Sequence, residues 1–124
     1  ATLELGQTTD DWLDTRLRNG IMGQVSMVRI ADIRDGTSTT LIVAEDADRE
    51  QDKEGPWADG RNSFTLYLPI NATNRESLFS LHPGGVNGMM ADGSVHFFIE
   101  EMELDILGEM VTRNGREVIR SDQW

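Results

Sequence analysis

Apolar and polar residues alternate over several short segments of the chain, and this two-residue period predicts β-strands. The predicted strands are 24–33, 37–45, 63–68, 86–91, 94–99 and, as a last short one, 117–120. Segment 24–33 has apolar residues on both faces, which favours a strand buried on both sides. Segment 37–45 is rich in β-branched residues. The Asp-Gly-Thr-Ser stretch at 35–38 is alternatively compatible with a helical turn before that strand.

The clearest local signal is Asp92-Gly93, which separates the apolar segments 86–91 and 94–99. A two-residue Asp-Gly loop suits the tight turn of a β-hairpin. Both central residues of that turn need a positive φ, which glycine adopts freely and aspartate tolerates. The sequence therefore predicts a hairpin here, and we expect it near the centre of the sheet.

Helical spacing appears at both ends of the chain. A short helix is predicted within 1–19, where Thr9 or Asp10 can cap its first free backbone N–H groups. A second helix is predicted at 100–114, because its apolar residues form one stripe and glutamates occur early. Gly115 follows as a typical C-terminal stop.

Together these elements predict an α+β fold, with an antiparallel sheet of about four to six strands and flanking helices. Polar segments 46–55 and 69–76 are predicted to be loops. No repeat or linker divides the chain, so residues 1–124 are expected to form a single domain.

Charge and composition exclude several classes of function. The formal net charge is -11, which disfavours binding to nucleic acid phosphates or anionic lipid surfaces. Cysteine is absent, so disulfides, thiolate catalysis and cysteine-ligated zinc are excluded. No run of about 18 apolar residues is present, and no membrane span is expected in this chain.

The acidic segment 46–55 is a candidate calcium site, with Asp46, Asp48 and Asp52 as candidate ligands. Calcium prefers six to eight oxygen ligands from carboxylates and carbonyls in a flexible loop. The glycine and final glutamate of an EF-hand loop are not at the required positions. A charged, solvated loop is therefore the alternative interpretation.

His82 is a candidate catalytic residue, because histidine titrates near neutral pH. Its nucleophilic partner would be Ser80, Ser94 or Thr37, but no nucleophile-elbow pattern is present. The alternative is a structural role, in which His82 hydrogen-bonds to the turn at Asp92 or to backbone.

Segment 82–95 resembles the C-terminal signature of the planctomycete pilin-like, prepilin-type proteins of unknown function. Their hallmark is a histidine, nine residues and Asp-Gly, and here nine residues separate His82 from Asp92. Three further segments are similar to that family: DGTSTTLIVAE at 35–45, PIN at 69–71 and TRNGREV at 112–118. Arg116 departs from the pattern, since the family has a second glycine there.

The resemblance implies that the shared motif residues have structural roles. They are His82, Gly84, Gly85, Asp92, Gly93, Asp35, Gly36 and Glu45. It also implies a non-catalytic subunit of a type IV pilus or a type II secretion-like (pseudopilin) assembly, at the cell surface or secreted. Its partners would be other pilin-like subunits or secretion and pilus components.

Full-length members of that family begin with a prepilin-type leader and a long hydrophobic helix, which the present sequence lacks. The chain is thus expected to be a soluble ectodomain or a member without that helix. Two alternatives stay open: a cell-surface calcium- or ligand-binding module, and a hydrolase using His82. Apart from calcium, no cofactor is expected.

Overall fold

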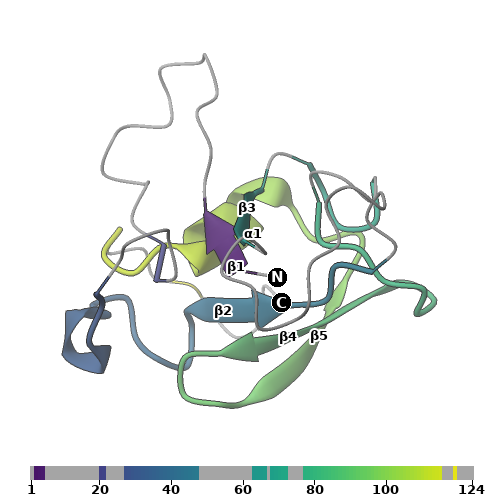
Figure 1. Ribbon diagram of the computed structural model, residues 1–124. Coiled ribbons are helices and arrows are strands. Elements are labelled where there is room, and N and C mark those ends of the chain that lie inside the picture. Colours follow the sequence, from purple (N-terminus) through teal and green to yellow (C-terminus); the bar gives the residue numbers. More distant parts are fainter. Residues whose placement is uncertain are drawn as a thin grey trace.

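The computed structural model describes residues 2–4, 20–21, 27–47, 63–66, 68–72, 77–115 and 119. Its elements in chain order are β1 (Thr2–Glu4), the 3-10 helix η2 (Ile30–Asp32), β2 (Leu41–Ala44), β3 (Ser63–Thr65), β4 (Gly85–Met90), β5 (Val95–Ile99) and α1 (Leu104–Val111). Figure 1 shows these elements along the chain.

The strands form one five-stranded sheet in the order β3-β1-β2-β4-β5. Strands β1 and β3 run parallel, whereas every other neighbouring pair is antiparallel. The predicted α+β class, with a largely antiparallel sheet and a helix packed against it, is therefore confirmed. Strand β1 was not predicted, because three residues are too few to establish a two-residue period.

The predicted hairpin is confirmed as β4 and β5, which pair in register from Gly85 with Ile99 to Met89 with Val95. Its expected position near the centre of the sheet was wrong, because β5 is the edge strand. The connection is also longer than predicted. The N–H of Gly93 donates to the carbonyl of Met90, and only Gly93 of the loop has a positive φ. This pattern matches a three-residue loop closed by a left-handed glycine.

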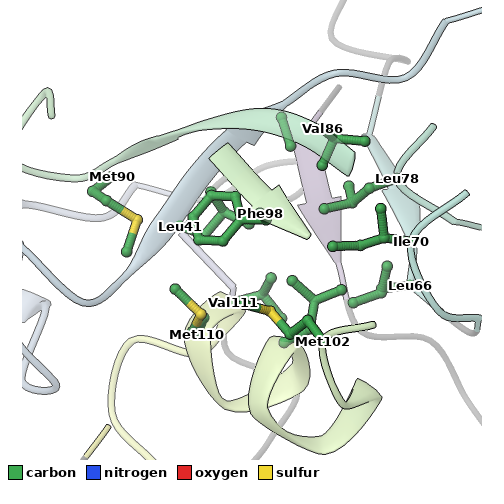
Figure 2. Close-up of a cluster of buried hydrophobic side chains, with 12 residues drawn as sticks. Leu41, Leu66, Ile70, Leu78, Val86, Met90, Phe98, Met102, Met110 and Val111 are labelled. Carbon is green, nitrogen blue, oxygen red and sulfur yellow. The ribbon is translucent and has the colours of Figure 1, made fainter. Parts of the chain in front are cut away.

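The core lies between the sheet and α1, as Figure 2 shows. Strands β2, β4 and β5 and the inner face of α1 contribute most of its side chains. The buried apolar residues are Leu41, Ala44, Leu66, Ile70, Leu78, Val86, Met90, Phe98, Met102, Leu107, Met110 and Val111. Burial of these side chains is the main term that stabilises the fold.

Gly88 makes room for the central aromatic ring of this core. A Cβ atom added at Gly88 would lie 2.7 Å from Leu41 Cδ1 and 2.7 Å from Phe98 Cε2. Phe98 is completely buried and lies two residue pairs along the hairpin, opposite Val86. The absence of a side chain at Gly88 thus lets the Phe98 ring lie across β4 against Leu41.

Two predicted segments were placed incorrectly. The described part of 24–33 is not a strand, because the Asp32 carboxylate accepts the backbone N–H of Arg29 at 2.9 Å and closes η2. The helix begins at Leu104 and not near residue 100, since Met102 N–H donates to the Ile99 carbonyl in a turn after β5. The helical turn considered for the start of segment 37–45 is confirmed as a turn, and the strand follows at Leu41.

Other predictions lie outside the described residues. These are the helix after Thr9 or Asp10, the acidic loop from Asp48 onward, and the strand at 117–120 apart from Ile119. Within the described ranges, no helix has the length and apolar character needed to cross a membrane.

We predict that Gly88→Ala lowers the free energy of unfolding by about 1 to 3 kcal/mol, because the new methyl group overpacks the core at Phe98 and Leu41. Gly108→Ala is the matched control. Gly108 lies inside α1 with nothing within 4 Å of an added Cβ, so the same change should stabilise the chain by about 0.5 to 1 kcal/mol. Denaturant unfolding measures both, and equal effects would contradict this account of Gly88.

Candidate functional site

The first polar site is the Glu45 cluster, which consists of Glu45, Ser80, His82 and Asn87. Glu45 Oε2 accepts the backbone N–H of Asn87 at 2.8 Å, and Oε1 accepts the Asn87 side-chain amide at 3.2 Å. The Nε2 atom of His82 lies 3.3 Å from Glu45 Oε1. The Ser80 hydroxyl donates a further hydrogen bond to the same carboxylate. One carboxylate thus joins the end of β2, the start of β4 and the segment before β4.

Backbone pairing brings these segments together. Glu45 N–H donates to the Asn87 carbonyl at 3.0 Å, which extends the pairing of β2 with β4 by one residue. On the other side, Phe79 N–H donates to the Glu45 carbonyl, and Ala47 N–H donates to the Phe79 carbonyl. Residues 45–47 therefore run between β4 and the segment around Phe79, and the Glu45 side chain reaches both.

Asn71 positions Ser80 within the cluster. The Asn71 side-chain oxygen accepts the Ser80 backbone N–H at 2.9 Å, and Asn71 N–H donates to the Leu78 carbonyl. Asn71 has φ +58°, a left-handed conformation that asparagine tolerates better than most residues. The Pro69-Ile70-Asn71 motif is thus a turn whose last residue holds the chain entering the cluster.

The electrostatics of the cluster keep Glu45 ionised. Partial burial raises the pKa of the Glu45 carboxyl, but hydrogen bonds from the backbone and side chain of Asn87, the Ser80 hydroxyl and the nearby His82 outweigh burial and lower the pKa below its ordinary 4.5. The side chain is 34% exposed and that of His82 is 57% exposed, so solvent reaches their contact. Glu45 is therefore a stable acceptor and a weak base.

A surface pocket of about 380 Å³ opens beside the cluster. Its lining residues are Glu45, Asp46, Ala47, Ser80, Leu81 and His82. It therefore contains two of the residues that a hydrolase using His82 would need.

The bonding order in this pocket differs from that of a catalytic triad. In a Ser-His-acid triad, the imidazole lies between the hydroxyl and the carboxylate and accepts the hydroxyl proton. Here the Glu45 carboxylate lies between Ser80 and His82, since both side chains bond to it. The Ser80 oxygen instead accepts the backbone N–H of His82 at 3.1 Å. The described contacts do not pair Ser80 with the His82 ring.

Only part of the predicted calcium site is described. Asp46 lines the pocket and both of its carboxylate oxygens are buried, whereas Asp48 and Asp52 lie outside the described residues. Where the chain is described, no group of three or more histidine, aspartate or glutamate side chains is arranged to hold a metal ion.

The second polar site is the Asp35 cluster, which consists of Asp35, Thr39, Thr112 and Gly115. Asp35 Oδ2 accepts the backbone N–H of Gly115 at 2.8 Å and the Thr112 hydroxyl at 3.3 Å. The Asp35 carbonyl accepts the Thr39 hydroxyl at 2.6 Å. Gly36 has φ +99°, which allows the chain to turn back over this hydroxyl. The cluster therefore joins the segment before β2 to the segment after α1.

Asp92 caps its own turn. Its Oδ1 atom accepts the N–H and the hydroxyl of Ser94 at 2.8 and 2.6 Å, and its backbone N–H donates to the Thr37 carbonyl. The side-chain and backbone bonds from Ser94 lower the pKa of the Asp92 carboxyl. The turn is thereby tied to the Asp35-Gly36-Thr37 segment.

Of the two partners suggested for His82, the turn at Asp92 does not contact it, because β4 separates them. The chain leaves His82, passes through Gly84 with φ +81°, and runs the length of β4 before it reaches Asp92. A strand rises about 3.3 Å per residue, so the six residues of β4 span roughly 20 Å. The residue that lies beside the start of β4 is Glu100, whose N–H donates to the Gly84 carbonyl.

The other candidate nucleophiles are likewise remote from the His82 ring. Ser94 bonds to Asp92 and to His96, whose Nε2 lies 3.0 Å from the Ser94 hydroxyl, and Thr37 contributes its carbonyl to the same turn.

The sequence did not reveal the roles of Asn87 and Thr112. Thr112 begins a recognised motif, but no local pattern marks Asn87, which is reached only through the pairing of β2 with β4.

The fold and its two clusters define a small α+β protein in which polar motif residues join distant loops to a mixed sheet. The chain belongs to the family described as "Protein of unknown function (DUF1559)", whose family model matches residues 2–105. That description names no activity, partner or location. No curated protein and no solved structure matches the chain.

We predict that Asp35→Ala lowers the free energy of unfolding by about 2 kcal/mol, chiefly because it removes the acceptor of the Gly115 N–H. The buried Thr112 hydroxyl also loses this acceptor but keeps the Glu109 carbonyl at 3.0 Å. Ser38→Ala in the same loop is the control, since Ser38 is exposed and its loss should have little effect. Thermal and denaturant unfolding measure both variants. Equal stability of Asp35→Ala and the wild type would contradict a structural role for this carboxylate.

Proposed function

We propose that the chain is a non-catalytic structural subunit of an extracytoplasmic, pilin-like or pseudopilin assembly, and that it acts through protein contacts. The observation that carries the proposal is that the carboxylates of the motif residues hydrogen-bond to backbone. Glu45, Asp35 and Asp92 each accept backbone N–H groups from other parts of the fold or from their own turn. Residues used in this way fix the geometry of loops.

The state of Glu45 further supports a structural subunit over a hydrolase. A catalytic acid or base works best when its pKa lies near the working pH, and enzymes raise a glutamate pKa to reach that range. The hydrogen bonds at Glu45 lower its pKa instead. The Ser80 hydroxyl donates to this carboxylate and does not pair with the His82 ring among the described contacts, so the base beside it is the weakly basic Glu45.

The resemblance of the motifs to pilin-like proteins gives the class of assembly. The His82 to Asp92-Gly93 segment supplies the first strand and the turn of the hairpin, and the similar segments at 35–45 and 112–118 meet in the Asp35 cluster. The motif thus corresponds to one connected frame within the fold, as expected when motif residues maintain a scaffold that presents surfaces to other subunits.

The test follows the full-length protein in the cells that produce it. We expect a chain-specific antibody to label the cell surface, and shearing followed by sedimentation to recover the chain with surface filaments or secretion complexes. Purified chain should hydrolyse p-nitrophenyl esters no faster than its Ser80→Ala variant. A cytoplasmic location, or ester turnover that disappears in both Ser80→Ala and His82→Gln, would overturn the proposal.

A further inference from the structure

On the side away from β4, strand β5 presents the N–H groups of Val95, Phe97 and Ile99 and the carbonyls of Val95 and Phe97, which pair with nothing else in the described residues. The bonds from Met90 N–H to Ser94 and from Glu100 N–H to Gly84 lie at the two ends of the hairpin ladder. Hydrogen-bonded pairs alternate along an antiparallel ladder, so His96 and Phe98 direct their N–H and C=O groups toward β4. The corresponding groups of Val95 and Phe97 and the N–H of Ile99 point to the open edge, whereas the Ile99 carbonyl accepts the Met102 N–H.

The same odd-numbered residues carry the largest exposed apolar side chains of the hairpin. Val95 is 64% exposed, Phe97 46% and Ile99 51%, whereas Phe98 between them is completely buried. We call Val95, Phe97 and Ile99 the β5 stripe. An exposed apolar edge strand is a template for pairing with another chain, and natural proteins otherwise blunt such edges with charges or proline within the strand.

Gly85 shapes the stripe from the neighbouring strand. A Cβ atom added there would lie 2.9 Å from Cε1 of the Phe97 ring, so the missing side chain lets that ring pack close to the β4 backbone. The stripe is therefore an exposed apolar surface along the edge strand of the sheet, where Figure 1 shows β5.

Carboxylates lie at both ends of the stripe and indicate what can pair with it. Asp92 precedes β5, Glu100 and Glu101 follow it, and all three are exposed. The hydrogen bonds from Ser94 keep Asp92 ionised. A second copy paired antiparallel about Phe97 would bring Asp92 of each chain toward Glu100 and Glu101 of the other, on chains of net charge -11. Like charges facing across strands are unfavourable.

We propose that the β5 edge binds an extended segment of another protein as an added strand, and that this segment alternates apolar residues between basic ends. Backbone hydrogen bonds to the open edge give affinity, alternate apolar side chains contact the β5 stripe, and lysine or arginine at each end faces the carboxylates. This inference rests on the proposed function, because it names the surface by which the subunit contacts a partner.

The test uses the full chain and a synthetic probe peptide in which valine-threonine-valine-threonine-valine lies between pairs of lysines. We expect saturable binding by calorimetry. Binding should weaken about ten-fold or more when glutamates replace the lysines, or when the central valine is N-methylated and loses its N–H donor. Phe97→Thr should weaken binding by a similar factor, whereas Met27→Thr, at a residue 98% exposed and outside the stripe, should not.

Three results of the binding and sedimentation experiments would overturn the inference. They are no binding of the lysine peptide, equal binding by the wild type and Phe97→Thr, and a dimer in sedimentation equilibrium that Phe97→Lys dissociates. Circular dichroism and thermal unfolding establish that both Phe97 variants are folded. Peptide binding by a chain that is absent from surface assemblies would contradict the proposed function alone. Normal recovery of full-length Phe97→Thr in those assemblies, without peptide binding, would contradict this inference alone.

Discussion

The arrangement of the loop before β4 depends on the hydrogen bonds that the Glu45 carboxylate accepts. This carboxylate receives a backbone N–H from β4, an amide from the Asn87 side chain and a hydroxyl from Ser80, with the His82 ring beside it. These donors are distant in sequence from Glu45, Asn87 by 42 residues, and without this acceptor they would need water or another partner. Hydrogen bonds to a charged acceptor are stronger than neutral ones, so this arrangement favours one conformation of the chain entering β4.

The two polar clusters lie at opposite ends of β2, and each joins a different pair of segments. The Asp35 cluster joins the start of β2 to the segment after α1, and the Glu45 cluster joins its end to the loop before β4. Between them, Leu41 and Ala44 are buried in the core with Phe98. Packing holds the layers together and the clusters fix the loops, which leaves the outer face and open edge of β5 for contacts.

Local chemistry explains which features were predictable from the sequence. The hairpin and the turn at Gly36 rest on residues that need particular φ angles, and both were found near their predicted positions. The edge position of the hairpin depends on how β1 and β2 pair, which no local pattern encodes. The partner of His82 was missed for the same reason, because Glu45 reaches it only through the pairing of β2 with β4. The segment at 27–33 is not the predicted strand, because the local hydrogen bond from the Arg29 N–H to the Asp32 carboxylate favours a 3-10 helix there.

The most direct test of the structural role of Glu45 is an NMR titration that follows its carboxyl carbon together with the backbone amide of Asn87. The account predicts a Glu45 pKa below 4.5 and an Asn87 amide signal that moves with the same titration, because protonation removes the charge that accepts this N–H. A pKa at or above 4.5, or an Asn87 amide that does not respond, would contradict it. A raised pKa would indicate a carboxyl group suited to proton transfer.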